Sequence, residues 1–360
     1  MKKLLVAVAV TVGLGTGAGI GQSNRPIIDL PGVERFATLP DGVRFPEGIT
    51  ANPANDAIYV STFDFGPNPN KLLRFGRSGH LIAQRDFDGT PLLGLAFDAS
   101  HDRVYIANFG ASKVQRIAAD FDGATPVDDV GTLPDVGPPG SRNVDNPDTS
   151  FDTIVFGAKH PAPNGLVFDH LGNLYVSDSF QGAIFRIDQA TTCAAPCAVT
   201  LVSHDPLLAT AGFPPFGANG LALNADETAL FVANTGDNRV LRLDLGTGTV
   251  SVFAESVHGA DGLLLDDSGH LWVAANQGNQ VVALNEKGRV VARVGEFEGI
   301  RRDGTPRGLL FPASMVIVGG HMYVTNLALP LTADVVGDEP EEDVTRWTIA
   351  RVRAPIGRRF

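Results

Sequence analysis

The sequence predicts an all-β protein, a six-bladed β-propeller of four-stranded antiparallel blades that is closed by an N-terminal strand. A strand motif recurs six times: an aliphatic residue, an aromatic residue, Val or Ile, and then Ser, Ala or Thr. Turn residues separate the repeats, and no apolar stripe of helical spacing is sustained beyond the N-terminal segment. Short strands repeated in this way are typical of propeller blades.

The N-terminus has the layout of a secretory signal peptide. Lys2 and Lys3 precede an apolar run, and small residues follow as far as Gly21. Four glycines dilute the run, whereas a membrane-spanning helix needs about 20 predominantly apolar residues. We therefore expect residues 1–21 to be a cleaved signal and residues 22–360 to form a single propeller domain. The protein would be exported to the periplasm or the extracellular space, with no membrane association after cleavage.

Composition bounds the partners of the chain. It has 28 Lys and Arg against 40 Asp and Glu, a net charge of −12. No basic cluster interleaves with aromatic residues, so nucleic acid is not an expected partner.

The two cysteines, Cys193 and Cys197, lie in one loop, and an oxidising compartment would allow them to form a disulfide. A metal site is disfavoured there, because no second pair of Cys or His residues lies nearby.

The six copies of the motif are the expected second strands of the blades. They are residues 58–61, 104–107, 174–177, 230–233, 271–274 and 322–325. Expected third strands follow at residues 113–117, 183–188, 239–244 and 280–285, and expected fourth strands at 81–84, 199–202, 250–253 and 290–293. β-branched and aromatic residues in these segments suit a pleated surface.

The two ends of the chain supply the expected closure of the ring. Residues 34–38 have the pattern of an outer strand without a blade of its own, and the sixth repeat ends after its third strand, residues 347–352. A propeller must close without leaving a long exposed strand edge. We therefore expect the N-terminal strand to complete the last blade.

One position in each repeat carries the candidate site. Counting back 11 to 13 residues from the Val or Ile of each motif gives Glu47, Leu93, Asn164, Asn219, Asp261 and Ala313. Gly follows in five cases, and Ser314 in the sixth. This position begins the innermost strand of a blade, so these side chains would meet around the central channel. Asn-Gly and Asp-Gly pairs are also common hairpin turns, but the repeated alignment favours a shared site.

The polar residues at this position predict a cation site. Glu47 and Asp261 would supply two negative charges, and two carboxylates crowded together repel each other unless a cation neutralises them. Asn164 and Asn219 complete an all-oxygen set. Hard cations prefer oxygen ligands, and water can complete the six to eight that Ca²⁺ takes. Ca²⁺ is the expected ion, with another divalent metal as the alternative, since zinc usually requires His or Cys.

These residues resemble the senescence marker protein, gluconolactonase and luciferin-regenerating enzyme superfamily of six-bladed propellers. The matching segments are Asp261-Gly262-Leu263 through residue 274, Asn219-Gly220-Leu221, Glu47-Gly48, and Ser314 with residues 319–325. The resemblance covers most of the chain after the expected signal. It implies one divalent metal bound in the channel by the matching Glu, Asn and Asp residues, with Asn164 beside the metal or the substrate.

The reaction that the resemblance implies is hydrolysis of a small-molecule lactone or related ester. The metal would polarise the carbonyl and stabilise the developing oxyanion. Asp261 would be a metal ligand and, as a catalytic residue, would orient or deprotonate water. Asn164 and Ser314 would contact the substrate. No nucleophile elbow of the G-x-S-x-G type is present, so a covalent mechanism is disfavoured.

Two histidines are further candidates because each lies close in sequence to a candidate ligand. His258 comes three residues before Asp261, and His160 four residues before Asn164. An imidazole suits general base catalysis near neutral pH. His258 is therefore a candidate catalytic base and His160 a candidate substrate contact, although loop histidines are more often simply solvated.

The sequence departs from the sugar-lactone members of the superfamily. Those members carry an Arg two residues before the Asn that matches Asn164, where this chain has Ala162. A sugar lactone is therefore not the expected substrate. Two long insertions, residues 124–161 and 192–217, lead into Asn164 and Asn219 and are expected to cover the channel mouth, where they would select the substrate.

A non-enzymatic function is the alternative. Propellers similar to NHL-repeat proteins have comparable repeats and serve as platforms that bind ligands or other proteins. An acidic stretch from Asp334 to Asp343 would suit an interaction loop, although it also reads as a solvated charged loop. Metal uptake separates the two functions. The oligomeric state is not indicated by any of these patterns.

Overall fold

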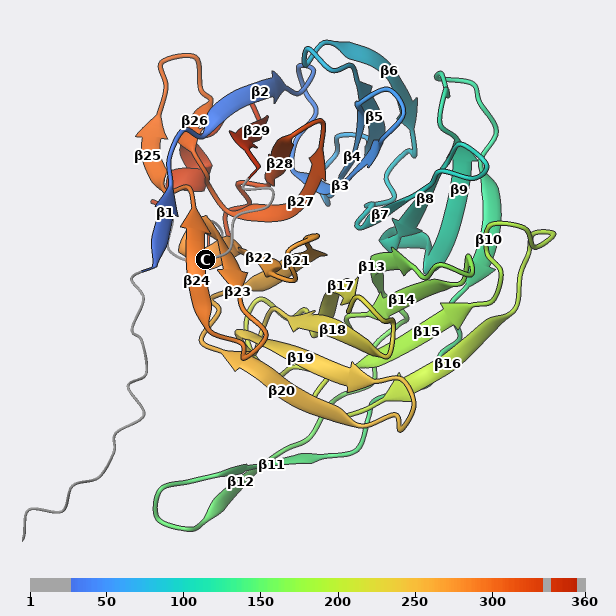
Figure 1. Ribbon diagram of the computed structural model, residues 1–360, viewed down its shortest axis with the longest axis vertical. Coiled ribbons are helices and arrows are strands. Elements are labelled where there is room, and N and C mark those ends of the chain that lie inside the picture. Colours follow the sequence, from blue (N-terminus) through green and yellow to red (C-terminus); the bar gives the residue numbers. More distant parts are fainter. Residues whose placement is uncertain (1–26, 333–337, 355–360) are drawn as a thin grey trace, which may run out of the picture.

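The computed structural model describes residues 27–332 and 338–354, and the expected signal peptide lies outside this part of the chain. Six sheets built from antiparallel strands stand around a central axis (Figure 1). The predicted six-bladed β-propeller is therefore confirmed.

The first three blades follow one another in the sequence, each running from the axis to the outside. Blade 1 consists of β3 (Pro46–Asn52), β4 (Ala57–Thr62), β5 (Lys71–Phe75) and β6 (Leu81–Asp86). Blade 2 consists of β7 (Leu95–Asp98), β8 (Arg103–Asn108), β9 (Lys113–Ala118) and β10 (Asp128–Thr132). Blade 3 consists of β13 (Pro163–Phe168), β14 (Leu174–Asp178), β15 (Ala183–Ile187) and β16 (Val199–His204).

The other three blades repeat this order, and two of them also take a strand from the N-terminus. Blade 4 consists of β17 (Ala218–Leu223), β18 (Ala229–Asn234), β19 (Arg239–Asp244) and β20 (Val250–Glu255). Blade 5 consists of β21 (Ala260–Leu265), β22 (Leu271–Ala275), β23 (Gln280–Leu284), β24 (Val290–Val294) and β1 (Ile28–Leu30). Blade 6 consists of β27 (Pro312–Val318), β28 (His321–Asn326), β29 (Thr348–Arg353) and β2 (Glu34–Thr38).

The closure of the ring is the one expected. β2 pairs antiparallel with β29, from Glu34 opposite Arg351 to Thr38 opposite Thr348. Phe36 of β2 packs edge-on against Tyr323 of β28, with ring centroids 4.7 Å apart. An unpredicted second contact lies beside this seam, because β1 adds to the outer edge of blade 5 in parallel with β24.

Smaller elements lie between the blades. Two hairpins, β11 (Arg142–Asp145) with β12 (Phe151–Ile154) and β25 (Phe297–Ile300) with β26 (Pro306–Gly308), are separate two-stranded sheets. Short 3₁₀ turns occur at η1 (Phe109–Ala111), η2 (Asn276–Gly278) and η3 (Pro340–Asp343). The expected insertion of residues 124–161 is shorter than predicted, because its first part forms β10. Its hairpin β11–β12 projects beyond the ring (Figure 1).

The aromatic residue of the strand motif connects neighbouring blades. The hydroxyl group of Tyr59 in blade 1 donates to the carbonyl oxygen of Ala119, which follows β9 of blade 2, at 3.0 Å. Tyr105 of blade 2 donates in the same way to Ala190, after β15 of blade 3, at 2.6 Å. Both tyrosines are buried. In blades 1 and 2 the motif therefore supplies apolar packing area and a hydrogen bond to the next blade.

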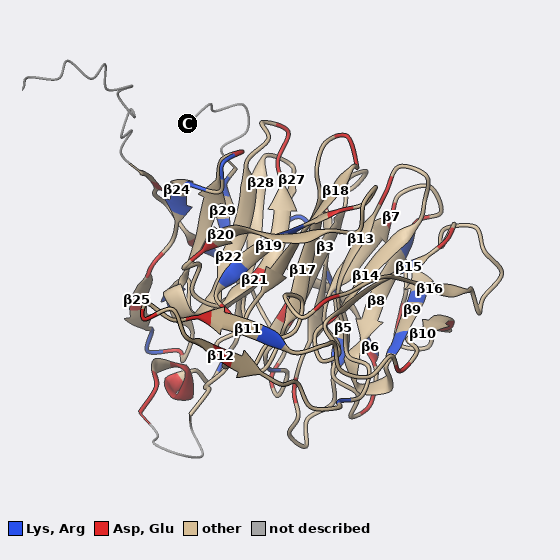
Figure 2. Ribbon diagram, turned by 90° about the horizontal axis from the view of Figure 1, so that it is seen from below, with Lys and Arg blue, Asp and Glu red and all other residues tan. Residues whose placement is uncertain are grey.

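Charged residues are dispersed over the molecule. In the side view of Figure 2, Lys and Arg segments alternate with Asp and Glu segments, and no continuous basic stripe is seen. Among the described residues, no helix has the length and apolar character needed to cross a membrane.

Candidate functional site

The candidate residues lie at a repeated irregularity of the innermost strands. In five blades the pairing of the first and second strands shifts by one residue, as between Pro163 and Leu166 in blade 3. Asn164 and Gly165 occupy the extra position there. Such a bulge redirects a side chain away from the regular alternation of a strand. The pairs predicted at this position therefore lie within strands, and the hairpin-turn interpretation of Asn-Gly and Asp-Gly is wrong for them.

The glycine in each pair is required by the close approach of adjacent blades. A Cβ atom on Gly165 would lie 2.4 Å from the carbonyl oxygen of Asn219, and one on Gly220 would lie 2.3 Å from that of Asp261. Gly48, Gly94 and Gly262 are equally confined by backbone of the following blade. We call these five residues the glycine ring. It places the backbones of the innermost strands in direct contact around the axis.

Hydroxyl groups on the second strands join several blades to their neighbours at the same level. Ser177 accepts a hydrogen bond from the Gly165 N–H at 2.7 Å and donates one to the carbonyl oxygen of Asn219 at 2.6 Å. Thr325 of blade 6 donates to the carbonyl oxygen of Glu47 in blade 1 at 2.7 Å. The backbone that carries the candidate ligands is therefore held by neighbouring blades.

The four predicted ligands line one cavity, which we call the cup. Its volume is about 40 Å³. Its lining consists of Glu47, Phe63, Leu93, Asn164, Pro214, Phe216, Asn219, Thr235, Asp261, Asn276, Phe311, Leu327, Leu329 and Leu331. Glu47, Asn164, Asn219 and Asp261 are each at most 5 % exposed. The structure therefore brings together all four residues that the sequence singled out as ligands.

Hydrogen bonds fix which end of each amide is available in the cup. Asn219 Nδ2 lies 2.8 Å from Thr235 Oγ1, and that hydroxyl donates its single hydrogen to the carbonyl oxygen of Ala260 at 2.7 Å. Thr235 can therefore only accept from Asn219, so the NH₂ group of the amide faces Thr235. This leaves the Oδ1 atom of Asn219 as the free end of its side chain.

The same arrangement recurs one blade earlier. Asn164 Nδ2 donates to Ser179 Oγ at 3.0 Å, and Ser179 Oγ donates to the carbonyl oxygen of Ala218 at 2.7 Å. The two asparagines are thus oriented alike, and each keeps a carbonyl oxygen for a ligand.

The surroundings of the two carboxyl groups in the cup disfavour their ionised forms. Burial raises the pKa of Glu47 well above its usual value, and the nearby Asp261 raises it further. Burial raises the pKa of Asp261 to about 7, although the amides of Asn276 and Asn219 partly oppose this shift. Neither group has a basic partner in the cup, so the ionised pair is costly without a cation.

Unpartnered oxygen atoms mark where a cation would bind. Glu47 Oε2 and Asp261 Oδ1 are buried and have no hydrogen-bond donor, and the same is true of Asn276 Oδ1. Buried polar atoms are normally paired, so such a group indicates a missing partner. Carboxylate and amide oxygens together fit a hard divalent ion such as Ca²⁺. In the described part of the chain, no three His, Cys, Asp or Glu residues cluster as a metal site, since the cup combines two carboxylates with amides.

A second repeated position contributes to the site and was missed in the sequence. The residue three places after the Val or Ile of each motif faces the ligand position across the blade. These residues are Phe63, Phe109, Ser179, Thr235, Asn276 and Leu327. Three of them, Ser179, Thr235 and Asn276, hydrogen bond to Asn164, Asn219 and Asp261. Counting forward from the motif, as well as back, would have found them.

The other predicted site residues lie outside the cup. His258 is exposed and does not line the cavity. His160 is also exposed, and its ring lies 5.2 Å from that of Phe180 near the mouth. Ser314 occupies the place of the glycine in blade 6, one residue beyond the ligand position, and lines the central channel instead.

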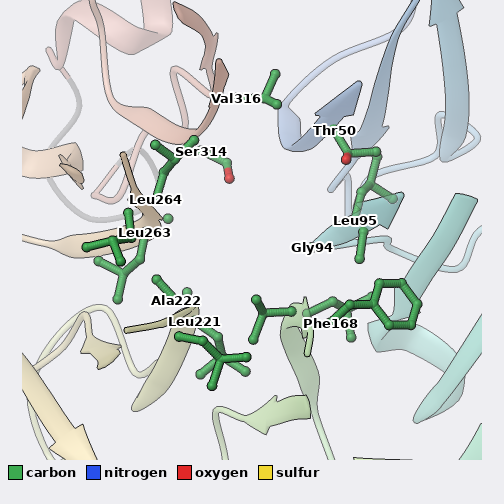
Figure 3. A pocket seen from close by; sticks show the side chains of 18 of the residues that line it. Thr50, Gly94, Leu95, Phe168, Leu221, Ala222, Leu263, Leu264, Ser314 and Val316 are labelled. Carbon is green, nitrogen blue, oxygen red and sulfur yellow. The ribbon is translucent and has the colours of Figure 1, made fainter. Parts of the chain in front are cut away.

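The central channel continues beyond the glycine ring as a separate cavity of about 500 Å³. Inner-strand residues that follow the glycines form its wall, and Figure 3 shows their mostly apolar side chains around an open centre. Thr50 and Ser314 supply hydroxyl groups there. The cup and this channel are therefore lined by successive residues of the same strands.

The expected covering of the cup is provided in part by the second insertion. Residues 192–217 contribute Pro214 and Phe216 to the lining. Cys193 and Cys197, at the start of this segment, form a disulfide with their Cα atoms 5.9 Å apart.

Comparison with known protein families gives a match in the part of the chain that carries two residues of the cup. A family model described as an SMP-30/gluconolactonase/LRE-like region matches residues 212–295, which include Asn219 and Asp261. The chain contains an SMP-30/gluconolactonase/LRE-like region. The resemblance inferred from the ligand positions is therefore confirmed, and blades 4 and 5 carry the matched part of this region.

The superposed structures match this chain over more of its length than the relative found by sequence does. The lactonase drp35 of Staphylococcus saprophyticus is 28 % identical over 137 residues, which span 36 % of this chain and 40 % of that relative. A luciferin-regenerating enzyme superposes with a TM-score of 0.61 at 17 % identity, covering 92 % of this chain and 97 % of that structure. Regucalcin from Agrobacterium tumefaciens, described as a calcium-binding protein, gives 0.58 at 17 % identity, with 91 % and 95 % covered. At these identities the two structures establish the fold alone.

Proposed function

We propose that this protein is a divalent-metal-dependent hydrolase that opens a lactone or related ester in the cup, with Ca²⁺ as the preferred ion. One observation carries the proposal: Glu47 and Asp261 are buried together, and each has an oxygen atom without a partner. Ion pairs, metal ions and reacting groups are the usual reasons for keeping two carboxylates in an apolar cavity.

The ligand set would be Glu47, Asn164, Asn219 and Asp261. When bound, the ion supplies Lewis-acid chemistry that polarises an ester carbonyl and stabilises negative charge on its oxygen. Ser179 and Thr235 hold the two amides with their oxygen atoms free, and Asn276 holds one oxygen of Asp261. Ligands fixed in this way need little rearrangement on binding an ion.

Asp261 is the best placed group for handling the water that attacks the carbonyl. Asn276 binds its Oδ2 atom at 3.0 Å, whereas its Oδ1 atom is unpartnered. An acceptor in this position orients a water molecule by taking a hydrogen bond from it. His258 is less suitable, because its exposed side chain is not among the residues that line the cup.

The comparisons support the reaction class. The relative named a lactonase matches over 40 % of its length, and the superposed regucalcin is named a calcium-binding protein. For this chain, hydrolysis, the ion and the ester class are parts of the proposal.

Elemental analysis and activity on one preparation test the proposal. We expect the purified protein to contain about one Ca²⁺ per chain, to melt at a lower temperature in chelator, and to recover when Ca²⁺ is added. Turnover of simple lactones and aryl esters should depend on the ion. Asp261→Asn should remove the Ca²⁺-dependent melting shift and lower kcat/KM at least 100-fold. Glu286→Gln, the same chemical change in an exposed turn, is the matched control and should behave as wild type.

Failure to take up any divalent metal would overturn the proposal. That outcome would favour the alternative, a propeller that serves as a binding platform. Metal uptake without turnover of any ester would retain the cation site and reject the hydrolase.

We also propose that the protein is exported. The disulfide between Cys193 and Cys197 supports this, since such bonds persist in oxidising compartments. N-terminal sequencing of protein recovered from the producing cells should begin near residue 22. A mature chain that begins at Met1 would refute export with cleavage.

A further inference from the structure

The walls of the cup differ from its floor. Apart from the polar residues, the lining consists entirely of aromatic, aliphatic and proline side chains: Phe63, Leu93, Pro214, Phe216, Phe311, Leu327, Leu329 and Leu331. None of these side chains can donate or accept a conventional hydrogen bond. A polar group placed against this wall would lose its bonds to water without replacement, at a considerable cost.

The polar groups of the floor are already committed to one another. One amide hydrogen of Asn164 is bound by Ser179, one of Asn219 by Thr235, and one of Asn276 by Asp261. Glu47 Oε2, Asp261 Oδ1 and Asn276 Oδ1 remain without a partner, and these oxygen atoms suit an ion. The oxygen atoms of the floor are thus required by the proposed ion, which leaves them unavailable to the hydroxyl groups of a sugar.

A continuous aromatic cluster extends the wall outward on the same side of the ring. We call it the aromatic rim, and it consists of Phe63, Phe65, Phe109, Phe180, Phe216 and the ring of His160. Phe216 connects its members: its ring centroid lies 5.9 Å from Phe63, 6.1 Å from Phe109 and 5.5 Å from Phe180. Residues from blades 1, 2 and 3 and from the segment before blade 4 thus form one surface.

Part of this rim is exposed to solvent. Phe65 is 67 % exposed, although its ring lies 4.7 Å from that of Phe63. The polar groups at the rim lie outside the cup: Lys159 Nζ lies over the Phe180 ring, 4.9 Å from its centroid, and neither Lys159 nor His160 lines the cavity. Exposed phenyl rings that continue into a buried apolar wall are typical of a binding site for apolar ligands.

We propose that the substrate of this site is hydrophobic, an ester or lactone with an alkyl or aryl substituent that lies along the aromatic rim. This inference rests on the proposed hydrolase function. The cup of about 40 Å³ has room for an ion and the reacting group only. The remainder of the substrate must therefore contact the rim, where Phe216 lies at the boundary between the cup and the exposed rings.

A series of γ-lactones with unbranched side chains of zero to eight carbons tests this directly. Burial of one methylene group contributes about 0.8 kcal/mol, which corresponds to about a fourfold gain in kcat/KM. We expect gains of two- to fourfold per carbon until the rim is covered, and we expect glucono-δ-lactone to react at least 100-fold less efficiently than the octyl compound. A flat dependence on chain length, or a preference for the sugar lactone, would overturn the inference.

Two variants locate the contact. Phe216→Ala should lower kcat/KM for the octyl lactone at least tenfold more than it lowers kcat/KM for unsubstituted γ-butyrolactone. Leu329→Ala, at another apolar residue of the lining, should produce a smaller loss of the same kind. Phe151→Ala removes an exposed phenyl ring from the outer hairpin and is the matched control. Equal loss for long and short substrates in Phe216→Ala would refute a specificity role, provided that its melting temperature matches that of wild type.

Binding of inert analogues separates this inference from the proposed function. Alkyl-substituted cyclopentanones, which have no ester bond, should bind more tightly with each added carbon when measured by calorimetry on the Ca²⁺-loaded protein. Such binding without turnover of any ester would reject the hydrolase but retain the apolar site. Turnover of lactones together with analogue binding that does not depend on chain length would retain the hydrolase and reject the apolar specificity.

Discussion

Asn276 donates a hydrogen bond to Asp261 Oδ2 at 3.0 Å, while Asp261 Oδ1 has no partner. The two oxygens of one carboxyl group thus have different surroundings. Asn276 begins the short turn η2 that directly follows β22, so its position is set by the backbone of the same blade. The bond fixes the plane of the carboxyl group and turns one oxygen toward the cup.

Replacement of Asn276 tests this relationship. In Asn276→Ala, Asp261 loses its donor, and we expect the dissociation constant for Ca²⁺ to rise 10- to 100-fold, the usual effect of removing a group that orients a metal ligand. Calorimetric titration of the metal-free protein measures it. Asn143→Ala on the outer hairpin, whose side chain accepts a bond from Thr153, is the control. An unchanged constant would show that Asp261 is oriented without Asn276.

The raised carboxyl pKa values predict how stability depends on pH in the absence of metal. For Asp261 and Glu47 the folded-state pKa lies above the unfolded value. The stability that these groups contribute to the folded state is therefore fully present below about pH 4, and it is lost as the pH rises through about 7 and beyond. In chelator, Glu47→Gln should therefore gain stability relative to wild type between pH 5 and pH 8, by on the order of 1–3 kcal/mol. Urea unfolding at each pH measures the difference.

Added Ca²⁺ should reverse this trend, because the ion binds the deprotonated carboxylates and its affinity rises with pH. Wild-type and Glu47→Gln curves that stay parallel from pH 5 to pH 8 would contradict the coupling between the two groups.

The glycine ring is predicted to tolerate no side chain. Gly220→Ala would place a Cβ atom 2.3 Å from the carbonyl oxygen of Asp261, so the backbone must move. We expect a loss of about 2–4 kcal/mol in the free energy of unfolding, together with weaker Ca²⁺ binding. Gly89→Ala is the control, since a Cβ atom there meets nothing within 4 Å. Its stability should stay within about 0.5 kcal/mol of wild type.

The seam of the propeller is predicted to depend on Phe36. This buried side chain of β2 packs on Tyr323 of β28, so Phe36→Ala should lower the free energy of unfolding by about 3–5 kcal/mol. Chemical denaturation measures the loss, with exposed Phe151→Ala as the comparison. Equal stability of the two variants would mean that β2 contributes little to ring closure.

The fold could be predicted because its repeat is local. The strand motif contains the aromatic, β-branched and small residues that a buried second strand needs. Residues 34–38 have the pattern of an outer strand but belong to no repeat of their own, which indicated that they complete the last blade. β1 was not foreseen, because three residues that pair in parallel with β24 have no periodic signal of their own. β10 was also not predicted as a strand, because its short run of residues adjoins a long irregular segment and was included in it.

The clustering of the four candidate ligands could be predicted because position in the repeat translates into position around the axis. Ser314 shows the limit of this reasoning: it lies one residue past the ligand position, and one step along an innermost strand leads from the cup into the channel. The apolar walls were also missed. Phe216 belongs to an insertion that follows no repeat, so only the folded chain shows which cavity it lines.

The bond from Thr325 to the backbone of Glu47 joins residues that are 278 positions apart. During synthesis on the ribosome, Glu47 emerges early, but the hydroxyl group that anchors it is among the last parts of the ring to appear. A nascent chain that stops before β28 therefore carries all four proposed ligands and yet lacks the contact that anchors Glu47. On the proposed function, uptake of the ion is accordingly a late event in maturation, and truncated products should remain free of calcium.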